Sequence, residues 1–204
     1  MNGRKLVGHV AVGIVAAALQ LCSFAQAVPT AIQQQRLSVF GAATETDTDL
    51  GGGSNTGVTA GVDLRLGGYR GFYPSIEVRA TYPFSKGDVV GETNVLAGVR
   101  FERLYGRFHP YANILFGRGR LDYVDGGLYD PTFTYIYYHS SSNVISPGAG
   151  VDMDLGNRFA VKVDAQLQRY STPVTTAGSL WSVPVSVGVV YKFDFNLRHK
   201  RSKK

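Results

Sequence analysis

The sequence has 204 residues and a formal net charge of +6, but most of the excess positive charge lies at its two ends. Arg4 and Lys5 lie near the N-terminus and five basic residues lie in the last seven, whereas all 15 Asp and Glu residues lie between Val28 and Phe195. The body of the chain is therefore close to neutral, which excludes the clustered basic groove that a nucleic-acid partner requires. The 25 Gly and 12 Tyr, without apolar residues at helical spacing, favour an all-β chain.

A cleaved signal peptide is predicted for residues 1–27. A cationic start precedes the apolar run Leu6–Leu19, and Ala25-Gln26-Ala27 supplies the small residues of a cleavage site. Cleavage removes Cys22, the only cysteine, so the mature chain has no thiol for a disulfide or a metal. We expect neither a metal nor another cofactor. Residues 28–35 are predicted to be a short polar lead into a single domain.

Eight segments then show the alternation of apolar and polar residues that is typical of strands. They are residues 36–46, 56–66, 73–82, 92–103, 111–121, 144–155, 159–170 and 181–195. The last segment is the longest, and its Pro184 must avoid a position where the sheet needs an N–H donor. The facing of the first segment and the register of the fifth stay open, because residues 41–43 and 118–120 do not alternate clearly.

The connections between these segments alternate between long and short. The long ones are residues 47–55, 84–91, 122–143 and 171–180. A closed antiparallel meander with loops at one end and turns at the other gives this pattern. The last segment is long enough to cross a bilayer, which takes roughly 9 to 11 tilted residues. We therefore predict an eight-stranded antiparallel up-and-down transmembrane β-barrel over residues 36–195, followed by a basic periplasmic tail at 196–204.

The polar face of the predicted strands carries both acidic and basic residues. These charged residues are Arg65, Glu77, Arg79, Arg100, Glu102, Asp152, Asp154, Lys162, Asp164 and Lys192. Eight strands enclose an interior that is just wide enough for side chains to fill, and buried charges persist only when they are paired. The pattern predicts a salt-bridged interior rather than a wide pore.

Aromatic residues gather near the strand ends, where the interfacial girdles of membrane barrels lie. Those predicted at the two membrane interfaces are Tyr73, Tyr82, Phe159, Tyr170, Trp181, Tyr191, Phe193 and Phe195. The repeated Val and Ala of the apolar face also favour contact with lipid, since a soluble core calls for mixed large and small side chains. The alternative is a soluble exported lipocalin-like barrel that binds a lipophilic ligand, and the charge alternation alone does not exclude it.

Four segments resemble the eight-stranded outer-membrane barrels of the OmpA/OmpX-like superfamily. Gly148–Asp152 and Phe159–Asp164, joined through a Gly-Asn-Arg turn, are similar to the sixth and seventh strands of these barrels. Pro110–Asn113 and Gly188–Phe193 are similar to the fifth and the last. The resemblance implies a cell outer-membrane protein but says little about activity. We expect a structural, adhesive or loop-mediated binding role and no enzymatic activity. The resemblance also implies two partners, the outer-membrane lipids and the barrel-assembly machinery, which would recognise the aromatic end of the last strand.

A membrane hydrolase is the second hypothesis, because some barrels of this size are lipid A deacylases with a His-x-Ser pair near an acidic residue. His139, Ser141 and Asp152 offer these residue types, and a Ser nucleophile needs such a base with an orienting carboxylate. Serines are common in loops, so a binding role is preferred, with an extracellular ligand expected at the long loops. His109, next to Pro110 in a short turn, is expected to be exposed.

Overall fold

The computed structural model describes residues 36–50, 54–85, 89–124 and 126–194. None of these residues forms a helix long and apolar enough to cross a membrane. The signal peptide, the polar lead, Phe195 and the basic tail lie outside the described residues, and they stay predictions.

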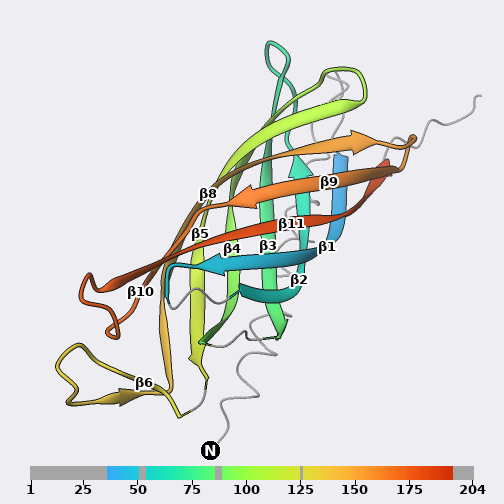
Figure 1. The fold of residues 1–204 in the computed structure, drawn as a ribbon. Helices are drawn as coiled ribbons and strands as arrows, with labels where there is room; N and C mark the ends of the chain where they lie inside the picture. The colour runs from blue at the N-terminus through green and yellow to red at the C-terminus, as the bar shows by residue number, and fades with distance from the viewer. Residues whose placement is uncertain (1–35, 51–53, 86–88, 125, 195–204) are drawn as a thin grey trace, which may run out of the picture. The chain divides into compact units, whose positions relative to one another are not determined.

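The described chain consists of strands that close into a barrel (Figure 1). The strands are β1 (Arg36–Thr48), β2 (Ser54–Arg65), β3 (Phe72–Ser85), β4 (Val90–Arg103), β5 (Phe108–Tyr123), β6 (Leu128–Tyr129), β7 (Ile136–Tyr137), β8 (His139–Asp154), β9 (Phe159–Gln166), β10 (Gln168–Ser171) and β11 (Ser179–Asp194). All pairs are antiparallel, and β11 pairs with β1, which closes the sheet. β9 and β10 follow one another in the same part of the wall, while β6 and β7 form a separate hairpin. The predicted eight-stranded all-β barrel is therefore confirmed.

The two ends of the barrel differ. One end, here called the loop end, carries the connections at 49–53, 86–89, 124–138 and 172–178. The opposite end, called the turn end, carries the short connections at 66–71, 104–107 and 155–158. The register between neighbouring strands runs without interruption over most of the wall, so each strand keeps one face inward and one outward.

The structure settles the facing of β1, which the sequence left open. Phe40, Ala42 and Thr44 are buried inside the barrel, while Gly41 and Ala43 are exposed. The small residues of the outer face still pair regularly with both neighbouring strands. The ambiguity arose because the two faces of this strand differ little in polarity.

β5 and β8 are longer than predicted, so much of the predicted loop 122–143 is strand. Their ladder continues through Arg118 opposite Asn143 and on to Asp122 opposite His139. Antiparallel pairing uses backbone groups and needs no apolar side chains, so the polar composition concealed these strand ends. The connection that remains contains the β6–β7 hairpin.

The wall is interrupted at Leu167, between β9 and β10. β11 pairs with β10 as far as Ser182 and with β9 from Val185 onward. Pro184 lies between these two ladders, where no N–H donor is required, so it avoids a ladder donor position on this side. Leu167 instead donates its N–H to the Pro147 carbonyl oxygen at 2.8 Å.

Candidate functional site

The turn-end half of the interior is filled by ion pairs, and Arg100 is one of its two centres. The Arg100 guanidinium lies 2.6 Å from a carboxylate oxygen of Asp152, 3.1 Å from Glu102 and 3.6 Å from Asp63. Arg65 binds the other oxygen of Glu102. The Arg100, Glu102, Asp152 and Asp63 side chains are buried, so the attraction between them is little weakened by solvent.

Arg79 is the second centre. It donates to Glu77 at 2.7 Å and to Asp164 at 2.6 Å, and all three side chains are buried. Asp164 also accepts hydrogen bonds from the Tyr111 hydroxyl at 2.7 Å and from the Gln166 amide at 2.9 Å. A buried carboxylate that accepts hydrogen bonds from three residues satisfies the rule that interior charges are paired and hydrogen-bonded.

Lys162 lies between the two centres and is almost fully buried. Its ammonium group is 3.6 Å from Asp152 and lies over the rings of Phe40 and Tyr111, at 4.6 and 4.2 Å from their centroids. The guanidinium of Arg100 lies over the Tyr111 ring as well, at 3.6 Å. Aromatic faces thus supply part of the negative potential that these cations require.

The structure brings together all ten interior charges predicted from the sequence, including Lys192, which binds Asp154. Sequence reasoning missed Asp63 and Tyr111 as members of the network. Asp63 could have been found, since it alternates with Val62 and Leu64 on the same strand.

His109 corrects a prediction. It was expected to be an exposed turn residue, but it is buried on β5. Its ring nitrogens lie 3.4 Å from Glu102 and 3.7 Å from Asp154, and Nε2 is 3.2 Å from the carbonyl oxygen of Gly106. β5 begins at Phe108, three residues earlier than predicted, so His109 is part of the strand. It lies two residues before the inward-facing Tyr111, and its ring is therefore on the inner face.

The loop-end half of the interior contains a cluster of apolar side chains, beside buried polar residues such as Glu92 and Asn94. This apolar plug consists of Val90, Leu96, Leu115, Leu121, Tyr123, Val144, Tyr170 and Leu180. Leu50, Leu128, Tyr137 and Val174 pack against it from the connections. Beside the plug, hydroxyl groups of Thr44, Thr59 and Thr81 form a hydrogen-bonded row across β1, β2 and β3. The described interior therefore contains two layers of side chains, the ion pairs at the turn end and the apolar plug at the loop end.

Two of the predicted interface aromatics lie inside the barrel. Tyr170 is fully buried in the apolar plug, and Asn94 donates to its hydroxyl oxygen at 2.8 Å. Tyr73 is on the inner face at the turn end, where the Arg65 guanidinium lies 4.9 Å from its ring centroid. The inward direction of these two side chains follows from the alternation of faces along a strand, because the side chains two residues away on each strand also point inward.

The other described interface aromatics lie on the outer face near the two ends of the barrel. Phe159, Tyr191 and Phe193 pack edge to face at the turn end, with centroids 5.2 and 4.7 Å apart. Tyr82 and Trp181 are exposed toward the loop end. These aromatic side chains therefore point outward at both ends of the barrel, and their place at the membrane interfaces stays a prediction.

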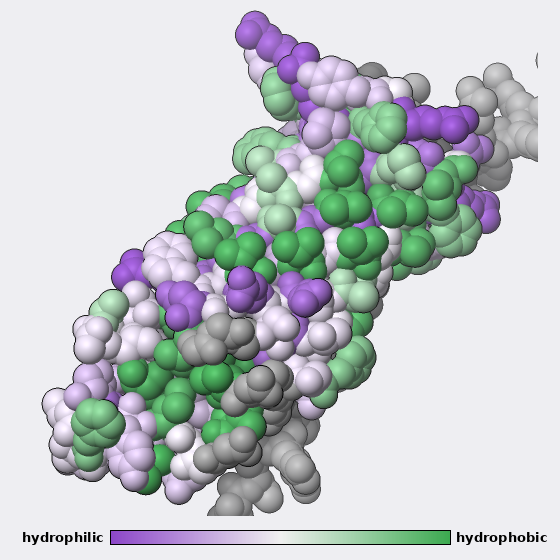
Figure 2. Space-filling model, viewed as in Figure 1, coloured by the Kyte–Doolittle hydropathy of each residue, from purple (hydrophilic) through white to green (hydrophobic). Residues whose placement is uncertain are grey.

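Between the two girdles the outer face is apolar. In Figure 2 green residues form a band across the visible wall, and a row of purple residues borders it on the side of the loop end. On β5 the band runs from Phe108 to Phe116, and Arg118 follows as the next outward residue. At about 3.4 Å per residue and a tilt near 40°, the span from Phe108 to Arg118 covers roughly 25 Å along the barrel axis, the height of a lipid-facing band. The lipocalin-like alternative is wrong, because the apolar face is outside and the charges are inside.

Solved structures of outer-membrane barrels are similar to this fold, although no family model and no curated protein matches the sequence. Neisserial surface protein A is 13% identical with a TM-score of 0.51, and the match covers 78% of this chain and 97% of that one. The attachment invasion locus protein of Yersinia pestis, in complex with the heparin analogue sucrose octasulfate, is 14% identical with a TM-score of 0.50, and the match covers 78% and 99%. The chain folds as an eight-stranded outer-membrane β-barrel. In such barrels the short turns are periplasmic, so the loop end faces the outside of the cell.

The proposed catalytic residues of a hydrolase are not brought together in this outer-membrane barrel. His139 and Ser141 lie on the outer face of β8, close to the loop end. Asp152 lies on the inner face of the same strand and binds Arg100. Eleven or more residues of extended strand separate them, which is about 36 Å or more. The carboxylate cannot orient this histidine.

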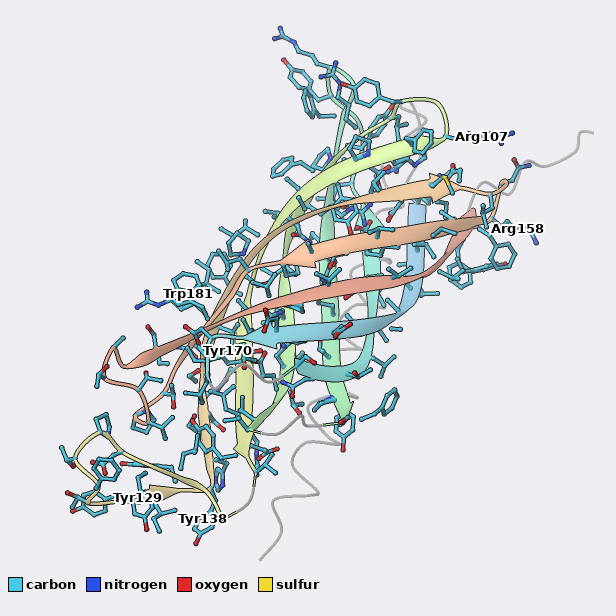
Figure 3. All side chains as sticks on the ribbon, in the orientation of Figure 1. Arg107, Tyr129, Tyr138, Arg158, Tyr170 and Trp181 are labelled. Atoms are coloured by element: carbon cyan, nitrogen blue, oxygen red, sulfur yellow. The ribbon has the colours of Figure 1, made fainter. Side chains whose placement is uncertain are left out.

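The β6–β7 hairpin is an exposed part of the loop end. Tyr129 and Phe133 pack with ring centroids 6.0 Å apart, and Phe133 is 78% exposed. Asp130 fixes the tip, because its carboxylate accepts hydrogen bonds from the Thr134 and Tyr135 amides at 2.7 and 2.9 Å. A hydrogen bond from the Thr132 hydroxyl, together with those from the Tyr135 and Thr134 amides, holds the pKa of Asp130 below its usual range. Tyr129 and Tyr138 lie at the end of the barrel opposite to the periplasmic turns (Figure 3).

Proposed function

We propose that this outer-membrane barrel acts by presenting its β6–β7 hairpin to an extracellular partner, rather than by conducting solutes or by catalysis. The observation that carries the proposal is the contrast between a filled interior and an exposed aromatic hairpin. Tyr129, Phe133, Tyr135 and Tyr138 are each more than half exposed. Exposed apolar surface of this kind marks interaction sites.

The hairpin is also anchored, so it can present these rings in a fixed arrangement. Leu128 and Tyr137 pack against the apolar plug, and the hydrogen bonds to Asp130 shape the tip. A surface that is ordered before binding loses less conformational entropy on association. Together these features support a binding surface with an apolar, aromatic recognition face.

The charge of the hairpin narrows the class of partner. Residues 126–138 contain one charged side chain, Asp130, and no Lys or Arg. The attachment invasion locus protein was solved with a sulfated heparin analogue. A hairpin without cations cannot neutralise sulfates, so we propose an uncharged partner, a neutral glycan or an apolar protein segment.

The test uses the barrel refolded in detergent, with a heat-dependent gel shift as proof of folding. Binding is measured to a panel of immobilised neutral glycans, sulfated glycans and extracellular-matrix proteins. We expect the wild type to bind a neutral member, and the substitution of Tyr129, Phe133, Tyr135 and Tyr138 by Ser to abolish that binding. The control substitutes Tyr69 and Tyr105, which are equally exposed on the periplasmic turns.

Two results would contradict the proposal. One is binding that survives the loss of the four hairpin rings. The other is a steady single-channel conductance of the wild type in planar bilayers, because the two layers of side chains in the interior leave no wide path for ions.

A further inference from the structure

The apolar band of the outer face ends at one level on four neighbouring parts of the wall, β5, β8, β10 and β11. The first outward side chains beyond it are Arg118, Asn143, Arg169 and Trp181, and all four are exposed. Their register brings them side by side, since Arg118 is opposite Asn143, and Arg169 is opposite both Trp181 and the last apolar residue of β8, Ile145.

The two arginines of this group lack a carboxylate partner among the described residues. Arg169 lies over Trp181, with the guanidinium carbon 5.6 Å from the ring centroid, and Arg118 has no ion pair. The next outward arginine on β5, Arg120, differs because it binds Asp122 at 2.6 Å. Two outward-facing cations are therefore available at the edge of the lipid-facing band.

An arginine on the lipid face is tolerated near an interface and is strongly destabilising at the bilayer midplane. Arg118 and Arg169 must therefore lie at the level of the lipid headgroups, where Trp181 also prefers to lie. Strands are about 4.8 Å apart, and the two arginines are also offset by two residues in register, so their backbones are roughly 12 Å apart across one intervening strand. Asn143 lies on that intervening strand and adds an amide donor.

We propose that Arg118, Asn143, Arg169 and Trp181 bind the phosphorylated sugar headgroup of a saccharolipid in the outer leaflet. Guanidinium groups match phosphate oxygens with two parallel hydrogen bonds, and the negative headgroup complements the unpaired cations. The proposal requires that the barrel spans the outer membrane, and it is independent of the partner of the hairpin.

The height of the wall favours a saccharolipid over a phosphoglyceride. β5 and β8 continue beyond the band with a polar outer face that includes Arg120 and Ser141. A headgroup of several sugar rings can lie along this wall, while the short headgroup of a phosphoglyceride ends near Arg118. The phosphates would bind at the two arginines and the sugars would contact the strands above them.

Trp181 allows a direct test, because it is the only tryptophan in the sequence. Barrels refolded into phosphatidylcholine nanodiscs are titrated with bisphosphorylated lipid A, with dephosphorylated lipid A and with phosphatidylglycerol, and the midpoint of the change in Trp181 fluorescence is measured. We expect saturable binding of the bisphosphorylated lipid, and at least tenfold weaker binding of the other two. Arg118→Gln combined with Arg169→Gln should weaken the first by at least tenfold.

The matched control is Arg107→Gln combined with Arg158→Gln, which removes two exposed arginines at the periplasmic end, away from Trp181 (Figure 3). This variant should bind like the wild type, and both double variants should keep the heat-dependent gel shift. The proposal is overturned if Arg118→Gln with Arg169→Gln binds lipid A as tightly as the wild type. It is equally overturned if phosphatidylglycerol binds as well as lipid A, which would indicate attraction to any anionic lipid.

Discussion

Removing the charge of Asp164 should destabilise the barrel far more than removing the charge of a surface carboxylate. Asp164 accepts hydrogen bonds from Arg79 at 2.6 Å, from Tyr111 at 2.7 Å and from Gln166 at 2.9 Å, and it is almost fully buried. In Asp164→Asn the new amide group faces the Arg79 donors, which leaves Lys162 and Arg79 with one carboxylate fewer.

The expected loss follows from the number of contacts that change. Hydrogen bonds to charged groups contribute about 1.5 to 3 kcal/mol each, and breaking a buried ion pair by removing one partner costs about 3 to 5 kcal/mol. Since Glu77 still binds Arg79, we expect the low end, about 3 kcal/mol. That is a loss of roughly a hundredfold in the ratio of folded to unfolded protein.

The assay is a urea titration of barrels refolded in lipid vesicles, followed by the heat-dependent gel shift. Asp122→Asn is the control, because its partner Arg120 is 53% exposed and exposed ion pairs contribute about 0 to 1 kcal/mol. If both variants change the free energy of unfolding equally, the interior pairs do not stabilise the barrel as argued here.

Three further predictions follow from the packing and the hairpin. In Gly98→Ala the new Cβ would lie 2.1 Å from the Ile114 carbonyl oxygen of the neighbouring strand, so the folded fraction on gels should fall, whereas Gly41→Ala, with nothing within 4 Å, should fold normally. Leu121→Ala in the apolar plug should lower the free energy of unfolding by about 2 to 5 kcal/mol in the same urea titration, and Ile136→Ala on the exposed hairpin should leave it nearly unchanged. Because the folded pKa of Asp130 is depressed, its contribution to the hairpin is complete above the unfolded pKa and is lost as pH falls through the folded one. The Thr134 and Tyr135 amide resonances should therefore titrate with a midpoint below that of an unstructured aspartate, and a midpoint at or above it would contradict the assigned hydrogen bonds.

The alternation of inward and outward side chains along each strand accounts for most of what could be predicted from the sequence, the strands and the charged interior. Alternation placed Arg79 and Asp164 on the inner face, and the need to pair buried charges then predicted the network. The same alternation places Tyr170 and Tyr73 inside the barrel, although both lie near strand ends, where interfacial aromatic residues are expected. The direction of an aromatic side chain determines whether it lies inside the barrel or on the lipid-facing surface. Its distance from the strand end matters only for side chains that point outward.

The apolar plug could not be predicted, because its members interrupt the alternation by which the strands were identified. Leu96 occupies a position where the alternation of its strand calls for a polar residue, and it is fully buried inside the barrel. Val190 interrupts the alternation of β11 in the same way and packs inside against Phe40. Such exceptions indicate that part of the interior is apolar. The residues that they contact lie on strands far apart in the chain, so the sequence pattern of a single strand does not identify these contacts.

The ion pairs across the interior also constrain how the barrel can be assembled. Arg79 on β3 binds Asp164 on β9, and Arg100 on β4 binds Asp152 on β8, so cations from the first half of the chain meet carboxylates from the second. A partly inserted sheet of β1 to β5 would lack Asp152 and Asp164, and it would turn Arg79 and Arg100, together with the carboxylates on β2 to β4 that they also bind, toward hydrocarbon, which is costly. The strands therefore cannot insert into the bilayer one hairpin at a time. The inner face of the partly formed sheet must be kept out of contact with lipid until β11 has paired with β1.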